Sequence, residues 1–266
     1  MEKSVKDRLR RLGIQPTKSL GQNFLEDGNI AKKIVNSSNI KGSDKVLEIG
    51  PGLGILTDFI VERAGKTILI EKDKSLISYL EGRYSNDNIN IIQGDVLEVE
   101  IPKFDMVVSN LPFSISSPVT FKLLKCDFKM GTLTYQKQFA DRMIAEVGEE
   151  EYSRLSVMVS ISAKVEKLFD ISRGSFFPPP KVDATVIRLI PSKPDFDLKN
   201  KEIFSKVVKE LFNYRRKKIK NALEIGLDVK IENVPFGGKR VGNISPEQIN
   251  EIVNYLLEEN MIDENK

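Results

Sequence analysis

Short apolar runs, each ended by a glycine, a proline or an acidic residue, recur along the first two thirds of the chain. Runs of this length predict buried strands. We expect seven, at residues 45–49, 67–70, 89–92, 104–109, 132–136, 165–169 and 184–189. The stretches between them include predicted helices at 55–63, 121–124, 137–147 and 154–163. Strands that alternate with helices predict an α/β fold, here with a mostly parallel sheet.

Both ends of the chain have helical patterns. Residues 1–43 predict a helical arm, interrupted at 13–16 and 19–25, with a helix start at Asp27. After the proline-flanked segment 191–194, residues 200–227 and 246–259 are predicted to be helical, and the last stretch begins at a Ser-Pro-Glu-Gln capping sequence. We therefore expect two units, residues 1–192 and an all-helical unit at 193–266.

Chemically suitable residues follow three consecutive strands. The first strand enters Gly50-Pro51-Gly52-Leu53-Gly54, the second ends at Glu71, and the third ends at Gly94-Asp95. Glycines let the backbone approach a ligand closely, and the helix start after them offers free amides. Glu71 has the spacing of a ribose-binding carboxylate, and Asp95 could accept from an adenine amino group. The Gly-x-Gly-x-Gly spacing differs from a pyrophosphate site and favours S-adenosylmethionine, which has no phosphate.

The fourth strand ends in Asn110-Leu111-Pro112-Phe113. The Asn amide and a carbonyl of the Leu-Pro segment are acceptors, and Phe offers a flat face to a base removed from its stack. Two acceptors on an adenine amino group could direct its lone pair toward an electrophile. On these four residues alone, a plain strand-to-turn connection with a core Phe is an equal alternative. Together with the preceding loops, they favour a methyltransferase.

Composition excludes several kinds of chemistry. The 266 residues include no histidine and one cysteine, Cys126, so imidazole catalysis, histidine zinc sites and an internal disulfide are excluded. Methyl transfer from a sulfonium needs no strong base. The chain has no apolar run that could span a bilayer and no signal-peptide pattern, and the single cysteine fits a reducing compartment. We expect a cytoplasmic protein with no membrane or metal partner.

Basic residues are concentrated in two stretches of a nearly neutral chain. The net charge is +3, from 41 basic and 38 acidic residues. One stretch contains Lys3, Lys6, Arg8, Arg10, Arg11 and Lys18, and the other runs from Tyr214 to Lys220. Such concentration predicts a phosphate-facing surface, although a solvated helix face is the commoner explanation of a charge run. The RNA-binding candidates are Arg10, Arg11, Arg215, Arg216, Lys217 and Lys218.

Taken together, these motifs resemble the KsgA-type rRNA adenine-N6 dimethyltransferase family over nearly the whole chain. The segments that carry the resemblance are residues 20–25, 48–54, 71, 94–95, 110–118, 152–156, 176–183 and 212–221. Many methyltransferases share the glycine-rich loop. Asn-Leu-Pro-Phe followed by Ile-Ser-Ser-Pro, together with Phe-Phe-Pro-Pro-Pro-Lys-Val-Asp, is far more specific.

The resemblance implies S-adenosylmethionine-dependent N6,N6-dimethylation of two adjacent adenines near the 3′ end of small-subunit rRNA. It implies a Rossmann-like sheet with a C-terminal RNA-binding domain, and a monomer acting on rRNA or a pre-30S-type particle. The implied cofactor residues are Asn23, Leu25, Gly50, Gly52, Glu71, Asp95, Val96 and Asn110, and the implied target loop is Asn110, Leu111, Pro112 and Phe113. The family most often has Tyr at the position of Phe113, so a hydroxyl contact is lost here while stacking is kept.

Two alternatives remain at this point. One is a large-subunit rRNA adenine methyltransferase of the antibiotic-resistance type, against which the segment 176–183 argues. The other is an assembly factor whose RNA binding matters more than its catalysis. The intact segment 110–113, with Glu71 and Asp95, argues against lost catalysis but not against an added role in assembly.

Overall fold

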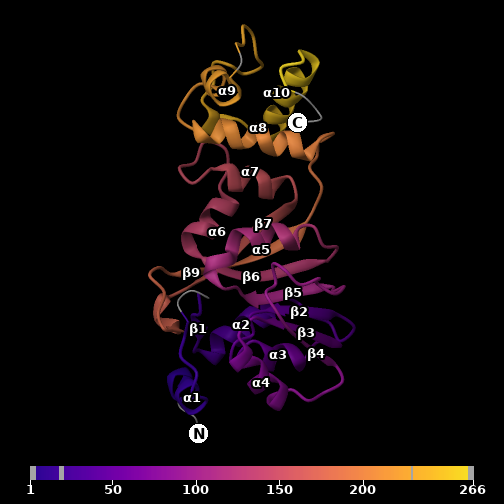
Figure 1. Ribbon diagram of the computed structural model, residues 1–266, viewed down its shortest axis with the longest axis vertical. Helices are drawn as coiled ribbons and strands as arrows, with labels where there is room; N and C mark the ends of the chain where they lie inside the picture. The colour runs from indigo at the N-terminus through magenta and orange to yellow at the C-terminus, as the bar shows by residue number, and fades with distance from the viewer. Residues whose placement is uncertain (1–3, 18–20, 229, 263–266) are drawn as a thin grey trace. The chain divides into compact units, whose positions relative to one another are not determined.

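The computed structural model describes residues 4–17, 21–228 and 230–262, so Lys3, Lys18 and Leu20 lie outside the described residues. The chain forms two compact units (Figure 1). The first comprises Met1–Ala140 and Val165–Pro191, and the second comprises Asp141–Lys164 and Ser192–Lys266. The division after residue 191 lies next to the predicted boundary at 192. Sequence patterns did not indicate that residues 141–164 belong with the C-terminal helices.

A seven-stranded sheet forms the centre of the first unit. The strands, in spatial order, are β4 (Ile89–Gln93), β3 (Lys66–Glu71), β2 (Lys45–Ile49), β5 (Met106–Asn110), β6 (Met130–Gln136), β9 (Ala184–Pro191) and β7 (Ala163–Ile171). Neighbouring strands from β4 to β6 are parallel, and β9 is antiparallel to β6. The predicted α/β fold with a mostly parallel sheet is confirmed.

The strand order reverses at β2, which pairs with β3 on one side and with β5 on the other. The register places Leu47 opposite both Ile68 and Val107. Loops that leave the carboxyl ends of β2 and β5 therefore start side by side, where open α/β sheets bind their ligands. This topology brings the glycine-rich loop to the segment 110–113.

Helices in the connections cover the sheet. They are α2 (Gly28–Ser37), α3 (Thr57–Val61), α4 (Lys74–Arg83) and α5 (Ser116–Leu123). Helix α6 (Lys137–Ile144) begins directly after β6 in the first unit and ends in the second. Buried Ile34 of α2 and Ile60 of α3 pack with Val46 and Val108 of the sheet in one apolar cluster. Asp27 caps α2 as predicted, whereas α4, which Asp73 caps, was not predicted. Helix α3 is shorter than the predicted 55–63 because the backbone turns through the preceding residues.

The N-terminal arm is attached to the first unit in two ways. Helix α1 (Val5–Arg11) buries Val5 and Leu9 in a small apolar cluster with Leu53 and Leu76. Strand β1 (Phe24–Leu25) pairs antiparallel with β8 (Phe176–Phe177). Residues 24–25, within the predicted interruption of the arm, therefore pair with the start of the segment 176–183, a contact that local patterns do not reveal.

The second unit is mainly helical, with α7 (Arg154–Ser160), α8 (Lys201–Asn213), α9 (Ile219–Leu227) and α10 (Pro246–Glu258). The predicted capping sequence is confirmed, because Ser245 and Gln248 form a capping box at α10. The predicted helical stretch 200–227 is wrong at residues 214–218, where Lys218 forms an antiparallel bridge with Arg240. The predicted helix 154–163 ends at Ser160 because Ala163 already belongs to β7.

Three short 3-10 turns complete the described elements: η2 (Phe113–Ile115), η3 (Arg173–Ser175) and η4 (Val241–Asn243). Helix α6 ends at Ile144, three residues before the predicted end at Val147. Over the described ranges of the chain, no helix has both the length and the apolar character needed to cross a membrane.

Candidate cofactor and target-base site

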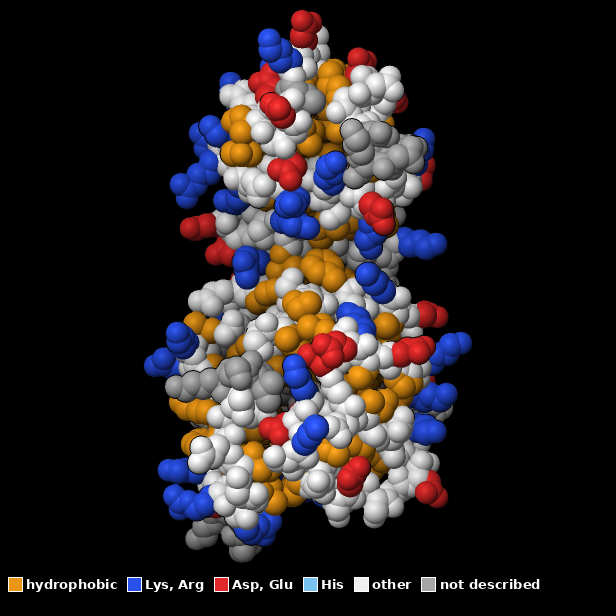
Figure 2. All heavy atoms as spheres, viewed as in Figure 1, with side chains coloured by type: hydrophobic (Ala, Val, Ile, Leu, Met, Phe, Trp, Pro, Cys, Tyr) orange, Lys and Arg blue, Asp and Glu red, His pale blue; other side chains and the backbone are white. Residues whose placement is uncertain are grey.

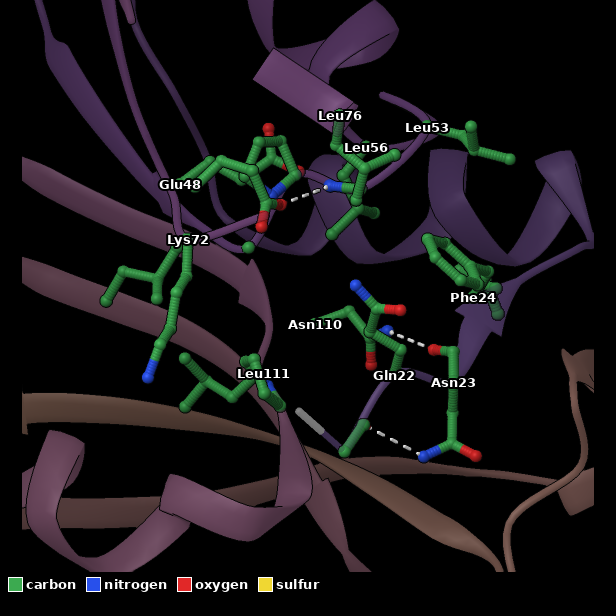
Figure 3. Close-up of a pocket in the computed structure, with 18 of the residues that line it drawn as sticks. Gln22, Asn23, Phe24, Glu48, Leu53, Leu56, Lys72, Leu76, Asn110 and Leu111 are labelled. Atoms are coloured by element: carbon green, nitrogen blue, oxygen red, sulfur yellow. Dashed lines mark hydrogen bonds between the residues drawn. The ribbon is translucent and has the colours of Figure 1, made fainter. Parts of the chain in front are cut away.

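A cavity of about 270 Å³ lies in the first unit, where the loops after β2, β3, β4 and β5 meet the N-terminal segment. Figure 3 shows Gln22, Asn23 and Phe24 from that segment across the cavity from Glu48 of β2 and from Lys72, which follows β3. All predicted cofactor and target-loop residues line this cavity: Asn23, Leu25, Gly50, Gly52, Glu71, Asp95, Val96, Asn110, Leu111, Pro112 and Phe113.

The glycine-rich loop needs its glycines for two reasons. Gly50 and Gly52 have φ values of +66° and +59°, which side chains disfavour. A Cβ on Gly50 would lie 3.3 Å from Pro112 Cγ, and a Cβ on Gly52 would lie 3.1 Å from the Phe24 ring. The loop after β2 is thus packed directly against the segment 110–113 and against β1.

Glu71 ends β3 with its carboxylate held by the backbone. Its side chain is buried, Oε1 accepts from the Asp73 N–H (2.9 Å), and Oε2 accepts from the Gly52 N–H (3.2 Å). Burial raises the pKa of Glu71, and the two backbone donors partly oppose this. A carboxylate fixed in this way at the cavity wall is suited to accept from a pair of ligand hydroxyls.

Asp95 is held by a lysine that sequence reasoning missed. Asp95 Oδ2 accepts from Lys72 Nζ (2.8 Å), and Oδ1 accepts from the Leu97 N–H (2.9 Å). The Lys72 ammonium holds the pKa of Asp95 below its usual range, with help from the Leu97 N–H. Lys72 also lines the cavity, and its place directly after Glu71 was the only sequence signal of this.

Asn110 presents an unpaired acceptor. Its Nδ2 donates to the Asn23 carbonyl oxygen (3.2 Å), and Asn23 Nδ2 donates to the Gly21 carbonyl oxygen (3.1 Å), as the dashed lines in Figure 3 show. Asn110 Oδ1 is buried and has no hydrogen-bond partner among the described residues. Buried acceptors are normally paired, so this atom is suited to a ligand N–H.

The structure distinguishes the two carbonyls of the Leu-Pro segment. The Pro112 carbonyl accepts from the Ile115 N–H (3.1 Å) and is used within η2. The Leu111 carbonyl is therefore the candidate second acceptor. The half-buried Phe113 ring lies edge-on to Phe176, with centroids 6.3 Å apart and planes at 65°. The segment 110–113 thus combines acceptors with an aromatic face at one end of the cavity.

In the second unit, Arg215 is engaged by the protein itself. Its Nε donates to the Tyr152 carbonyl (2.7 Å) and its Nη2 donates to the Glu149 carbonyl (2.6 Å). Arg215 therefore connects residues 149–152 to the segment between α8 and α9 by two hydrogen bonds. This contact gives a structural role to a residue predicted to bind RNA.

The three residues after Arg215 are exposed, and two further cations lie beside them. The Ile219 N–H donates to the Lys239 carbonyl (2.9 Å), and the Val241 N–H donates to the Lys217 carbonyl (3.1 Å). This pairing forms a basic ribbon of exposed side chains: Arg216, Lys217, Lys218, Lys239 and Arg240. Sequence reasoning missed Lys239 and Arg240. On the face shown in Figure 2, basic and acidic side chains are interspersed, so overall charge does not mark an RNA surface there. Arg10 and Arg11, in the first unit, are also exposed.

Comparisons with known proteins agree with this fold. The family model described as ribosomal RNA adenine dimethylase matches residues 14–258. A protein of Thermococcus sibiricus, named probable ribosomal RNA small subunit methyltransferase A, is 45% identical, covering 96% of this chain and 97% of its own. A protein of the same name from Pyrococcus furiosus is 43% identical, with 93% and 94% covered.

Two solved structures are also similar. A dimethyladenosine transferase from Plasmodium falciparum has a TM-score of 0.79 and 31% identity, with 89% of this chain and 98% of that chain covered. The 23S rRNA methyltransferase ErmE has a TM-score of 0.69 and 26% identity, with 88% and 99% covered.

The cavity at the switch point of a mostly parallel sheet, together with the similarity to the dimethyladenosine transferase structure, defines a Rossmann-like methyltransferase. The chain belongs to the ribosomal RNA adenine dimethylase family. It is an rRNA adenine dimethyltransferase, and its cofactor is S-adenosyl-L-methionine. The family resemblance read from the motifs is thereby confirmed, and ribosomal RNA is the class of partner.

Proposed function

We propose that the chain transfers methyl groups from S-adenosyl-L-methionine to N6 of two adjacent adenines near the 3′ end of small-subunit rRNA, two to each. The observation that carries this proposal is the buried, unpaired Oδ1 of Asn110, in the same cavity as Glu71 and Asp95. The names of the relatives at 45% and 43% identity support the small-subunit substrate.

The cofactor half of the cavity has a suitable polar group for each part of the ligand. Glu71 would accept from the ribose hydroxyls, because its carboxylate is already oriented by two backbone donors. Asp95 would accept from the cofactor's adenine amino group, with Val96 beside the ring. The remaining residues would surround the amino-acid end and cover the ligand: Asn23, Leu25, Gly50, Gly52 and Asn110.

The target half acts by positioning. When bound, the cofactor supplies a methyl group made electrophilic by a sulfonium. Asn110 Oδ1 and the Leu111 carbonyl would accept the two N–H groups of the target amine and direct its lone pair into the cavity. Phe113 would stack on the flipped base. Because the chain has no histidine, orientation must supply much of the rate, and proximity can contribute about 7 to 11 kcal/mol.

The second methylation requires less of the site. A monomethylated amine keeps a single N–H, so one of the two acceptors suffices to orient it. The first methyl group then has to fit on the side of the amine that faces away from the acceptor still in use. Both methylations would therefore use the same residues, with dimethyladenosine as the end product.

RNA would be held by phosphate contacts outside the cavity. The basic ribbon and the exposed Arg10 and Arg11 are the candidate groups, and such contacts do not depend on sequence. We place the chain as a cytoplasmic monomer acting on small-subunit rRNA or an assembling pre-30S-type particle. The single, unpaired Cys126 supports a reducing compartment.

The test is mass analysis of rRNA nucleosides after incubation with the protein and isotopically labelled cofactor, with the two ribosomal RNAs supplied separately as naked RNA and as particles. We expect dimethyladenosine in two neighbouring positions of the small-subunit RNA. Label in large-subunit RNA alone would instead support an activity like that named for ErmE. Absence of label from every substrate, in a protein that binds the cofactor, would contradict the proposal.

A further inference from the structure

A buried carboxyl group in the cavity has no part in the function proposed above. Glu48 lies on β2, two residues before Gly50, lines the cavity and is 1% exposed. Its Oε2 accepts a hydrogen bond from the Thr57 hydroxyl (2.6 Å). The other carboxyl oxygen has no hydrogen bond to any residue in the described ranges. Figure 3 shows Glu48 among the residues at the sheet side of the cavity.

The charged groups nearest Glu48 are acidic. Asp58 of α3 and Glu71 of β3 face it, as does the Tyr84 phenol after α4. Asp58 is itself paired with Arg83. No Lys or Arg within the described residues forms an ion pair with Glu48. An ionised carboxylate in this position would therefore be desolvated without a compensating cation.

The protonation state follows from these surroundings. Burial raises the pKa of Glu48 to about 8, the acidic neighbours add to the rise, and the Thr57 hydroxyl opposes it. Near neutral pH the carboxyl is therefore mostly protonated while the cavity holds no ligand. A cation placed beside it would favour its ionised form and lower its pKa again.

S-adenosyl-L-methionine has two such cations, the sulfonium and the α-ammonium of the amino-acid end. The cofactor placement proposed above puts the amino-acid end at Gly50, which follows the end of β2 and lies two residues after Glu48. We infer that Glu48 is the specificity residue for the α-ammonium group and becomes its counter-charge by releasing its proton to solvent when the cofactor binds. The inference rests on the proposed cofactor placement. In this step only the carboxyl O–H bond breaks, and the proton goes to the buffer.

Proton release makes binding pH dependent. Below the pKa of free Glu48, each unit of pH decrease should weaken cofactor affinity by up to about tenfold, because the proton must first be removed. Ligands that lack the amino-acid end should not show this dependence. Glu48 would thus discriminate the complete cofactor from its nucleoside fragment.

The experiment is titration calorimetry of the full chain at pH 6.5 in buffers of different ionisation enthalpy, which counts the protons released. The ligands are S-adenosylmethionine, S-adenosylhomocysteine (same amino-acid end, no sulfonium charge) and 5′-methylthioadenosine (no amino-acid end). We expect about one proton released with the first two and none with the third. Glu48→Gln keeps the Thr57 contact but cannot ionise, so it should release none and bind the first two at least tenfold more weakly. Binding of methylthioadenosine should be unchanged.

Glu62→Gln is the matched control, because it removes an exposed acid at the end of α3 and should leave proton release intact. Proton release with S-adenosylmethionine but not with S-adenosylhomocysteine would overturn the inference, because the sulfonium and not the α-ammonium would then be the cation that ionises Glu48. Tight binding of S-adenosylmethionine and S-adenosylhomocysteine without proton release would also overturn it. So would undiminished proton release in Glu48→Gln. Failure of the unaltered chain to bind any of the three ligands would instead count against the proposed cofactor site. The three-ligand comparison on the unaltered chain decides the inference even if Glu48→Gln does not fold.

Discussion

Asn110 Nδ2 donates a hydrogen bond to the carbonyl oxygen of Asn23, 87 residues earlier in the chain, at 3.2 Å. This contact uses the donor end of the Asn110 amide and leaves the acceptor end, Oδ1, buried and unpaired. The N-terminal segment therefore orients the Asn110 amide, in addition to lining the cavity.

Asn110→Ala should lower the rate of methyl transfer by about 10² to 10³, the usual cost of losing one preorganised hydrogen-bonding group. Affinity for the cofactor should change only a few fold, because the other cavity residues remain. Single-turnover transfer to rRNA, measured beside calorimetric cofactor binding, separates the two effects. Retention of full activity would contradict the proposed role of Oδ1.

Glu71→Ala should weaken cofactor binding by roughly 1.5 to 3 kcal/mol, the value of hydrogen bonds to a charged group. It also leaves the Gly52 and Asp73 N–H groups without their acceptor. Glu71→Gln keeps one acceptor oxygen and should lose less affinity. Titration calorimetry provides the measurement, with circular dichroism as a check on folding. Equal dissociation constants for all three proteins would remove Glu71 from the cofactor site.

Phe113→Ala removes the stacking partner of the target base and should weaken binding of that base by roughly 1 to 3 kcal/mol. Phe113→Tyr keeps the aromatic face and should change methyl transfer very little. A time course of mono- and dimethyladenosine, separated by chromatography, measures this. Monomethyladenosine should stay a minor species throughout. An unaltered chain that makes only the monomethyl product would contradict the proposed double transfer.

Arg215 and the neighbouring lysines should behave differently. Arg215→Ala removes the side chain that donates hydrogen bonds to the carbonyl oxygens of Tyr152 and Glu149, and it should lower the free energy of unfolding by roughly 1.5 to 3 kcal/mol. Replacing Lys217 and Lys218 with Ala should leave stability unchanged and reduce the slope of log affinity for RNA against log salt by about 0.7 to 0.9 per lysine. Denaturant unfolding and RNA binding at several salt concentrations give the two measurements.

The matched control for that pair is the replacement of Lys206 and Lys230, two exposed lysines of the same unit, with Ala. This change removes the same charge without touching the basic ribbon. Equal slopes for both double variants would show that the basic ribbon is only a solvated surface.

Glu48 should also make stability pH dependent in the absence of cofactor. Its pKa is about 8 in the folded chain against 4.5 for the ordinary group, so the folded state binds the proton more tightly. Its contribution is therefore fully present below pH 4.5 and is lost as the pH rises to about 8, by up to about 1.4 kcal/mol per unit. The free energy of unfolding of Glu48→Gln should accordingly rise relative to the unaltered chain between pH 5 and 8. Parallel pH profiles for the two proteins would refute this.

Local patterns were sufficient for most of the sheet and for the residues at its strand ends. Apolar runs ended by Gly, Pro or acidic residues marked the seven strands of the large sheet. For β2, β3 and β5 the reason is that buried parallel strands are covered on both faces and are therefore mostly apolar. Helices were predicted less well. Helix α4 was missed, and the stretch 200–227 was predicted without its interruption, because residues 214–218 retain helical composition while their backbone pairs elsewhere.

The sequence by itself determined which residues could form the cavity, since the carboxyl ends of neighbouring parallel strands must meet at one edge of the sheet. Gly50, Glu71, Asp95 and Asn110 follow from that rule. Only the tertiary structure decided how these groups are oriented and which others join them. Lys72 reaching Asp95, Arg215 reaching the carbonyls of residues 149 and 152, and β1 pairing with β8 all join positions far apart in the chain. Such contacts depend on the packing of whole elements, and a local pattern of residue types carries no information about them.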